Sequence, residues 1–246
     1  MVYEFTELQG VMGYYYALAQ KEDEEVALAL KEQYMPLGEN GELPATHSGA
    51  ILSLATKLDN LIGLFSTGKV PTGSKDPFAL RRAAIGLIRI IVDKQYPLDI
   101  AKIITKASKQ YNDYDKESLI RFVYDRIAQI RKEVNPSIIH AVLATEDKNI
   151  TEIFKRIDVM DAFTKRSDFG DLLAIFKRVA NITKDFDLSQ VSIDPARFET
   201  PYEKALFEHV MVNAEDETVR QNRKSLIAAI YLRFKTVADI KEITAA

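Results

Sequence analysis

The chain has 246 residues, of which 47% are hydrophobic and 28% are charged, a composition typical of a globular protein. It has no cysteine and three histidines, which excludes disulfides and thiolate metal sites and disfavours a zinc site. No apolar run approaches the ~20 residues that span a bilayer, and the N-terminus lacks the features of a signal peptide. We therefore expect a cytoplasmic protein without a membrane partner.

Charge is nearly balanced along the whole chain. The net charge is −3, and residues 1–110 contain 12 basic and 13 acidic side chains, so neither half carries a field that would attract a polyanion. Nucleic-acid binding would therefore depend on local basic patches or on parts of a longer polypeptide.

Helical periodicity dominates and no segment alternates as a strand does, so the sequence predicts an all-α fold. Gly10 and Gly13 in the first helix would allow another helix to approach closely. The helix after Asp76 is apolar nearly all round towards its C-terminal end, which predicts burial. In the N-terminal half, helices are expected over Phe5–Tyr16, over Glu22–Tyr34, from a Ser48 cap through Phe65, over 77–94 with Asp76 as N-cap and Pro77 as first residue, and within 97–116.

The polar stretch KQYNDYDKE is taken as the junction between two domains, 1–112 and 113–246. Beyond it, Asn135 and Pro136 form a helix start, and Thr200–Glu203 matches a capping box. Helices are expected near 117–132, 136–145, 150–164, 167–184, 201–214 and 217–235.

Several segments, in order, resemble a known family. They are MVYEFTELQGVMG, ELPATHSGAILSLATKLDNLIGLFSTG, PTGSKDPFALRRAAIGLIRI, FKRVANITK, SIDPARF and VMVNAEDETVRQNRKSLI followed by VADIKEI. Together they cover almost the whole chain and resemble the beta subunit of bacterial two-subunit glycyl-tRNA synthetases. The resemblance implies that residue 1 lies inside a longer polypeptide.

The resemblance implies a division of labour. An alpha subunit would hold the class II catalytic core, and the whole enzyme, of two alpha and two beta chains, would use ATP and Mg²⁺ to charge glycine tRNA. This chain would hold the tRNA on its anticodon side, with no catalytic residue, no cofactor and no DNA partner. Residues 1–112 would be part of a degenerate HD-like helical domain, and 113–246 a helical anticodon-binding domain like that of arginyl-tRNA synthetase.

The HD-like assignment raises an alternative function, a metal-dependent phosphohydrolase. The family's Glu-His-Tyr stands here as Glu32-Gln33-Tyr34, and its Ala-Asp-Lys-Leu-Asp as Ala55-Thr56-Lys57-Leu58-Asp59. Both changes remove a candidate ligand and leave only His47, in a loop, and Asp59, so no metal is expected. A further alternative is a scaffold that docks the alpha subunit without touching RNA.

Candidate RNA contacts follow from helix spacing. Lys177, Asn181 and Lys184 form a stripe, opposite Leu172, Ile175, Val179 and Ile182. Such a stripe is either a solvated face or a phosphate contact; spacing alone favours the first, and the resemblance makes the two equal. The candidates are Lys177, Arg178, Asn181, Lys184, Arg220 and Lys224. Arg223 falls within an apolar stripe and is interpreted as a paired structural residue.

Thr72-Gly73-Ser74-Lys75-Asp76 lacks the spacing and the preceding strand of a phosphate loop. Its place before a helix would suit an anion, but Asp76 as a cap would occupy the same position, and we favour the cap. Lys75, Arg81 and Arg82 then remain as candidate contacts to the tRNA backbone or to another subunit.

Overall fold

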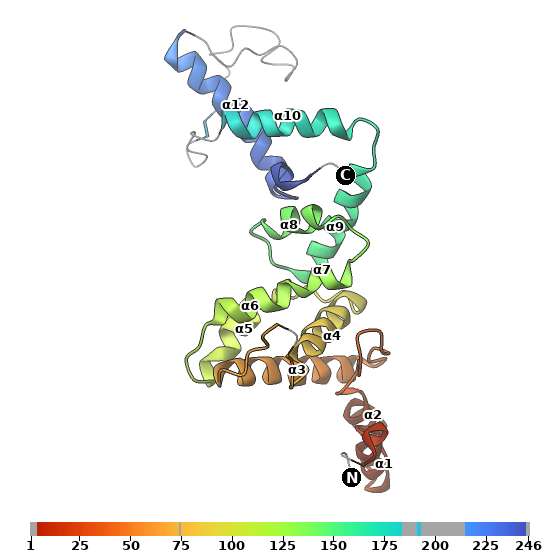
Figure 1. Ribbon diagram of the computed structural model, residues 1–246. Coiled ribbons are helices and arrows are strands. Elements are labelled where there is room, and N and C mark those ends of the chain that lie inside the picture. Colours follow the sequence, from red (N-terminus) through yellow and green to blue (C-terminus); the bar gives the residue numbers. More distant parts are fainter. Residues whose placement is uncertain (1–3, 74, 184–190, 193–214, 245–246) are drawn as a thin grey trace. The chain divides into compact units, whose positions relative to one another are not determined.

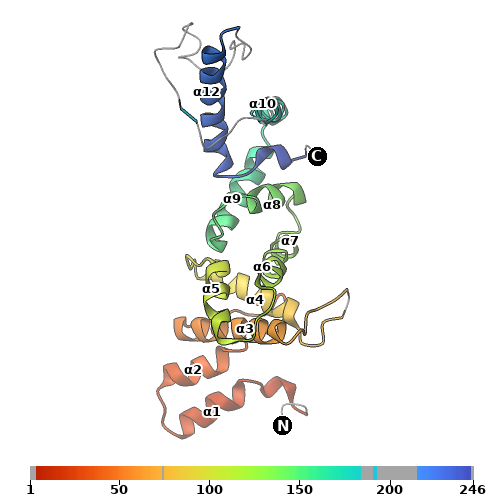
Figure 2. The same ribbon diagram turned by 90° about the vertical axis from the view of Figure 1, so that its left-hand side faces the viewer.

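The computed structural model describes residues 4–73, 75–183, 191–192 and 215–244 (Figures 1 and 2). Within these ranges the regular elements are helices, without a β-strand, so the predicted all-α fold is confirmed. No helix in the same ranges is long and apolar enough to cross a bilayer. The chain divides into two compact units, Met1–Glu133 with Lys148–Phe154, and Val134–Asp147 with Lys155–Ala246. The domain boundary expected after residue 112 stays a prediction.

Unit 1 is a series of packed helices. Helix α1 packs on α2, α2 on α3 and α3 on α4, while α6 and α7 cover α4 (Figure 1). The most deeply buried element is α4, as its apolar sequence predicts. The elements are η1 (Thr6–Leu8), α1 (Val11–Ala19), α2 (Glu24–Glu32), α3 (His47–Ser66), α4 (Leu80–Asp93), α5 (Ile100–Ala107), η2 (Ser108–Gln110), α6 (Lys116–Tyr124) and α7 (Arg126–Ile130).

Gly10 divides the first predicted helix into η1 and α1. Its φ of 80° is a left-handed conformation that side chains disfavour, and a Cβ there would lie 2.7 Å from the Lys31 carbonyl oxygen. A Cβ at Gly13 would lie 3.9 Å from Leu30 Cβ. The predicted close approach of a second helix is therefore confirmed, and that helix is α2.

Two helix starts differ from the prediction. The cap of α3 is Thr46, whose hydroxyl accepts from the Gly49 N–H at 3.0 Å, and not Ser48. The carboxylate of Asp76 does accept from the backbone N–H groups of Leu80 and Arg81, each at 2.9 Å. However, α4 begins at Leu80 rather than at Pro77, because Ala79 adopts a left-handed φ of 55° that interrupts the helix.

A buried lysine joins α3 to the segment before it. The Nζ of Lys57 donates to the Met35 carbonyl oxygen at 2.7 Å and contacts the Ser53 hydroxyl at 2.9 Å. No carboxylate within the described ranges pairs with it, and burial lowers the pKa of Lys57 to about 8. The neighbouring Glu32 is also buried, and its carboxylate accepts from the backbone N–H groups of Ala45 and Thr46.

Unit 2 contains α8 (Pro136–Leu143), α9 (Ile150–Thr164) from Lys155 onwards, α10 (Phe169–Ile182), α12 (Glu217–Lys235) and η5 (Ile240–Glu242). The ranges predicted for α9 and α12 are both confirmed, with the same first and last residues. Asn135 caps α8 as predicted, accepting from the Ser137 N–H at 2.9 Å. The C-terminal segment lies along α8, where the Asp239 N–H donates to the Ala141 carbonyl oxygen at 2.8 Å. The helix predicted over 201–214 and the capping box at Thr200–Glu203 lie outside the described residues.

The free energy of unfolding should rise between about pH 8 and pH 10.5, by up to about 3 kcal/mol. Lys57 loses its proton near pH 8 in the folded chain and near 10.5 in the unfolded chain, so the unfolded state binds more protons across this interval. Urea denaturation at several pH values measures the slope. The slope should be measured below pH 10. Above pH 10, Tyr111 and Tyr231, whose pKa values are raised to about 12, lower the free energy of unfolding as the pH rises.

Lys57→Met is the matched variant, since it keeps the length of the side chain and removes the titrating group. It should show a flat profile between pH 8 and pH 10. An equal slope in Lys57→Met and in the unaltered chain would show that another group is responsible.

Candidate nucleic-acid interface

Helix α10 presents one charged face. Lys177, Arg178 and Asn181 are exposed, and Phe169, Leu173 and Val179 are buried on the other side. Ile175, predicted on the apolar face, is instead 50% exposed. It lies three residues before Arg178 and therefore on the same side of the helix. Lys184 lies outside the described residues.

Helices α10 and α12 pack against each other (Figure 1). Their contact is made by aromatic and aliphatic side chains. The rings of Phe176 and Phe234 are 4.7 Å apart, and Val179 clusters with Ile227 and Tyr231. The contacts run in opposite order along the two helices, so the N-terminal half of α12 lies towards the C-terminal end of α10. The structure thus brings the predicted residues of both helices to one helix pair.

The basic side chains of α12 are less exposed to solvent than predicted. Arg220 and Lys224, expected to point outward, are both half-buried, and Arg220 forms an ion pair with Glu217. Arg223 is half-buried as well, consistent with its position beside the apolar face. Exposure alone therefore favours Lys177 and Arg178 on α10 over the α12 residues as contacts for a large polyanion.

The loop before α4 carries the second predicted group. Lys75 and Arg82 are exposed, whereas Arg81 is half-buried and donates to the Gly73 carbonyl oxygen. The carboxylate of Asp76 accepts from the first two N–H groups of α4 and so takes the place that an anion would occupy. The N-cap residue itself is Ala79, and not Asp76 as predicted.

Arg126, which the sequence analysis did not single out, lies near this loop. Burial lowers its pKa, and the nearby Arg81 lowers it further, against the opposite effect of Asp125 and Asp76. Its guanidinium carbon lies 4.9 Å from the centre of the Phe122 ring. Only the folded chain brings Arg81 and Arg126 together, because 45 positions separate them in the sequence.

The positions that match the HD motif have structural contacts. The Gln33 side chain donates to the Leu30 carbonyl oxygen at 2.9 Å, and the Thr56 hydroxyl donates to that of Leu52 at 2.9 Å. Asp59 accepts from the Tyr111 hydroxyl, and this bond is the main cause that raises the pKa of Tyr111 to about 12.

His47 is the first residue of α3 rather than part of a loop, and its Nδ1 lies 2.6 Å from the Tyr96 hydroxyl. In the part of the chain that the structure describes, no three His, Cys, Asp or Glu residues cluster so that they could hold a metal ion.

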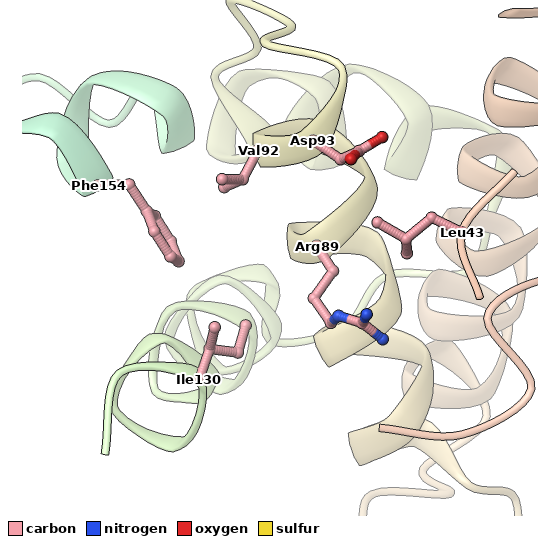
Figure 3. A pocket seen from close by; sticks show the side chains of 6 residues that line it. All are labelled: Leu43, Arg89, Val92, Asp93, Ile130 and Phe154. Atoms are coloured by element: carbon pink, nitrogen blue, oxygen red, sulfur yellow. The ribbon is translucent and has the colours of Figure 1, made fainter. Parts of the chain in front are cut away.

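Two of the hollows in unit 1 are lined in part by charged side chains. One, of about 260 Å³, is lined by Leu43, Arg89, Val92, Asp93, Ile130 and Phe154 (Figure 3). Its charged side chains are engaged elsewhere, since Arg89 donates to the Gly41 carbonyl oxygen at 3.1 Å and Asp93 lies 3.2 Å from Lys94. Its remaining walls are apolar, which indicates a packing gap rather than a reaction site.

The other hollow lies beside α5 and is rich in lysine. The sequence analysis did not single out its residues Lys102, Lys106 and Lys109, although their helical spacing was visible. Their spacing could not show the opposite side of the hollow, because that side is formed by residues of α6 and by Lys148, which are distant in the sequence.

The described residues define an all-α protein of two helical units, with exposed cations on one helix of the second unit. A family model described as glycyl-tRNA synthetase beta subunit matches residues 1–144. The glycine–tRNA ligase beta subunit of Pseudomonas fluorescens is 38% identical over 99% of this chain and 42% of its own length. That of Helicobacter pylori is 38% identical over 99% of this chain and 40% of its own length.

The chain belongs to the glycyl-tRNA synthetase beta-subunit family. It spans about two fifths of the length of the curated relatives that it matches. The expected family is therefore confirmed.

Asp76→Ala should lower the free energy of unfolding by about 1 kcal/mol, because the N–H groups of Leu80 and Arg81 lose their acceptor. Chemical denaturation measures the loss. Asp76→Asn keeps a side-chain acceptor and should cost less. Equal stability of Asp76→Ala and the unaltered chain would show that other groups satisfy this helix end. If the loop contacts RNA, removing this carboxylate should also raise the affinity for tRNA at low salt.

Proposed function

We propose that this chain is a tRNA-holding part of the beta subunit of a glycine–tRNA ligase. The proposal rests on family membership, since the similarity to these beta subunits extends over 99% of the chain. In the proposed enzyme an alpha subunit performs the chemistry with ATP and Mg²⁺, in an assembly of two alpha and two beta chains. This chain contributes binding of the anticodon side of the tRNA and no reacting group.

The observation that carries RNA contact is the exposed face of α10. Lys177 and Arg178 are adjacent, both exposed, and neither forms an ion pair with any residue that the structure describes. Asn181 follows on the same side and adds a hydrogen-bonding amide. Phosphate contacts in nucleic-acid complexes come from such basic and amide side chains. Lys184 would extend the row and stays a prediction from the sequence.

Unit 1 offers a second group of cations. Lys75 and Arg82 are exposed in and after the loop that precedes α4, and Arg81 is half-buried beside them. We propose that they contact the tRNA backbone or another subunit. Because Asp76 neutralises part of their charge, this group is the weaker of the two.

A protein-docking role is a second candidate, and one observation favours it. Tyr15, Tyr16 and Leu18 of α1 are exposed, with exposed fractions of 60%, 57% and 38%. Large apolar side chains gathered on one helix are typical of a surface that another protein covers. This role is compatible with RNA binding by α10.

Lys177→Gln combined with Arg178→Gln should weaken tRNA binding and flatten its salt dependence. Each lost phosphate contact lowers the slope of log affinity against log salt by about 0.7–0.9, so the pair should lower it by up to about 1.8. The measurement is a titration of the chain with glycine tRNA over a range of salt. Stability should change by no more than about 0.5 kcal/mol, because both side chains are exposed.

Two controls accompany the titration. Lys21→Gln with Lys132→Gln removes the same charge from exposed positions elsewhere and should leave most of the slope unchanged. Arg223→Ala should lower the melting temperature without changing the slope. Unchanged affinity in the α10 variant, with a lost slope in Arg223→Ala, would show that the roles of the two helices are reversed.

The chain alone should form no glycyl-tRNA from glycine, ATP and tRNA. The described residues contain no strand from which the antiparallel sheet of a class II core could be built. Charging should appear only when the alpha subunit and the rest of the beta subunit are added. An aminoacylation activity that stays with the chain through further purification would contradict this assignment.

A further inference from the structure

Three lysines lie along one face of α5 and the turn that continues it. Lys102, Lys106 and Lys109 are exposed and spaced at i, i+4 and i+7. The opposite face is anchored by Ile100 and Ile104, which are fully buried. Because these two isoleucines are packed in the interior, the lysine face of α5 points towards solvent. With a rise of about 1.5 Å per residue, successive lysines are about 4.5–6 Å apart along the axis.

The lysines line a shallow hollow that is open to solvent. It has a volume of about 490 Å³ and lies where α5 packs against α6. Its charged lining residues are Lys102, Lys106, Lys109, Lys148, Asp99 and Glu117. Four cations thus face two carboxylates, in a chain whose net charge is −3.

Neither carboxylate forms an ion pair with Lys106 or Lys109. Asp99 caps α5 by accepting from the Lys102 N–H at 3.1 Å, and it also lies 3.2 Å from the Lys102 ammonium. Glu117 is exposed in the first turn of α6 and forms no ion pair with a described residue. Lys106 and Lys109 likewise pair with no carboxylate in the described ranges.

Solvation of an ordinary helix face explains this arrangement poorly. A lysine near the C-terminus of a helix is stabilised by the helix dipole, and Lys106 benefits in this way. That effect does not account for three lysines on one face of α5 and its following turn, joined by Lys148 from a separate segment at the same hollow. Cations gathered on one face add their fields, which favours an extended anion over scattered counterions.

We propose that this lysine hollow binds phosphate groups of the tRNA backbone, as a second RNA contact besides α10. The inference rests on the proposed function, because it takes the polyanion to be tRNA. Phosphate contacts position an RNA without reading its bases. The hollow should therefore contribute equally to the binding of glycine tRNA and of an unrelated tRNA.

The test neutralises Lys106 and Lys109 together, as Lys106→Gln with Lys109→Gln, and repeats the salt titration with both tRNAs. The slope of log affinity against log salt should fall by about 1.4–1.8 for each tRNA. The matched control is again Lys21→Gln with Lys132→Gln. Circular dichroism and the melting temperature check that the variant folds.

A second measurement avoids substitutions. Acetylation of lysines in the unaltered chain, read by mass spectrometry, should show Lys106 and Lys109 protected by tRNA while Lys21 and Lys132 stay reactive. This result keeps the inference testable even if the double variant folds poorly.

The outcomes separate the two claims. If the unaltered chain binds tRNA but Lys106 and Lys109 are neither protected nor needed, the inference is overturned and the proposed function stands. If the chain binds no tRNA at low salt, both fail. Loss of alpha-subunit binding with unchanged tRNA affinity in the variant would also overturn the inference, since the hollow would then face a protein.

Discussion

Helix α4 has to be covered over most of its surface, because its residues from Ala83 to Val92 are all apolar except Arg89. Covering it requires α3, α6 and α7, and these helices leave their own polar faces outside. At Gly86 the approach is so close that a Cβ would lie 2.8 Å from the Cε of Lys57. Burial of this one helix thus sets the packing of unit 1 and forces Lys57 into an interior where its charge is costly.

Unit 2 depends on a smaller contact of the same kind. Phe176 and Val179 of α10 meet Phe234, Ile227 and Tyr231 of α12. Since these side chains occupy one face of α10, Lys177 and Arg178 are left in water. The apolar contact and the charged face are two sides of one helix, and the first determines where the second points.

The charge distribution explains how a chain with a net charge of −3 can serve as an RNA-binding module under the proposed function. A weak global field gives no long-range attraction, so binding has to come from small groups of cations held by packed helices. The exposed pair on α10 and the lysine hollow beside α5 are such groups. Both consist of lysine or arginine opposite buried aliphatic residues, so their positions follow from core packing.

The sequence by itself determined the features that depend on near neighbours. The all-α class, the ranges of α9 and α12 and the Asn135 cap follow from periodicity and from residues within a few positions of each other. The family could also be recognised, because its motifs occur in order along the chain. The domain boundary and the tRNA contacts stay predictions.

Tertiary structure decided what depends on residues far apart in the sequence. Thr46 rather than Ser48 caps α3, beside the carboxylate of Glu32. Ile175 is exposed because α12 covers a different face of α10, and the hollow beside α5 exists only where α6 and Lys148 close it. Periodicity gives the faces of a helix, but the partner that covers each face comes from another part of the chain, and packing alone selects it.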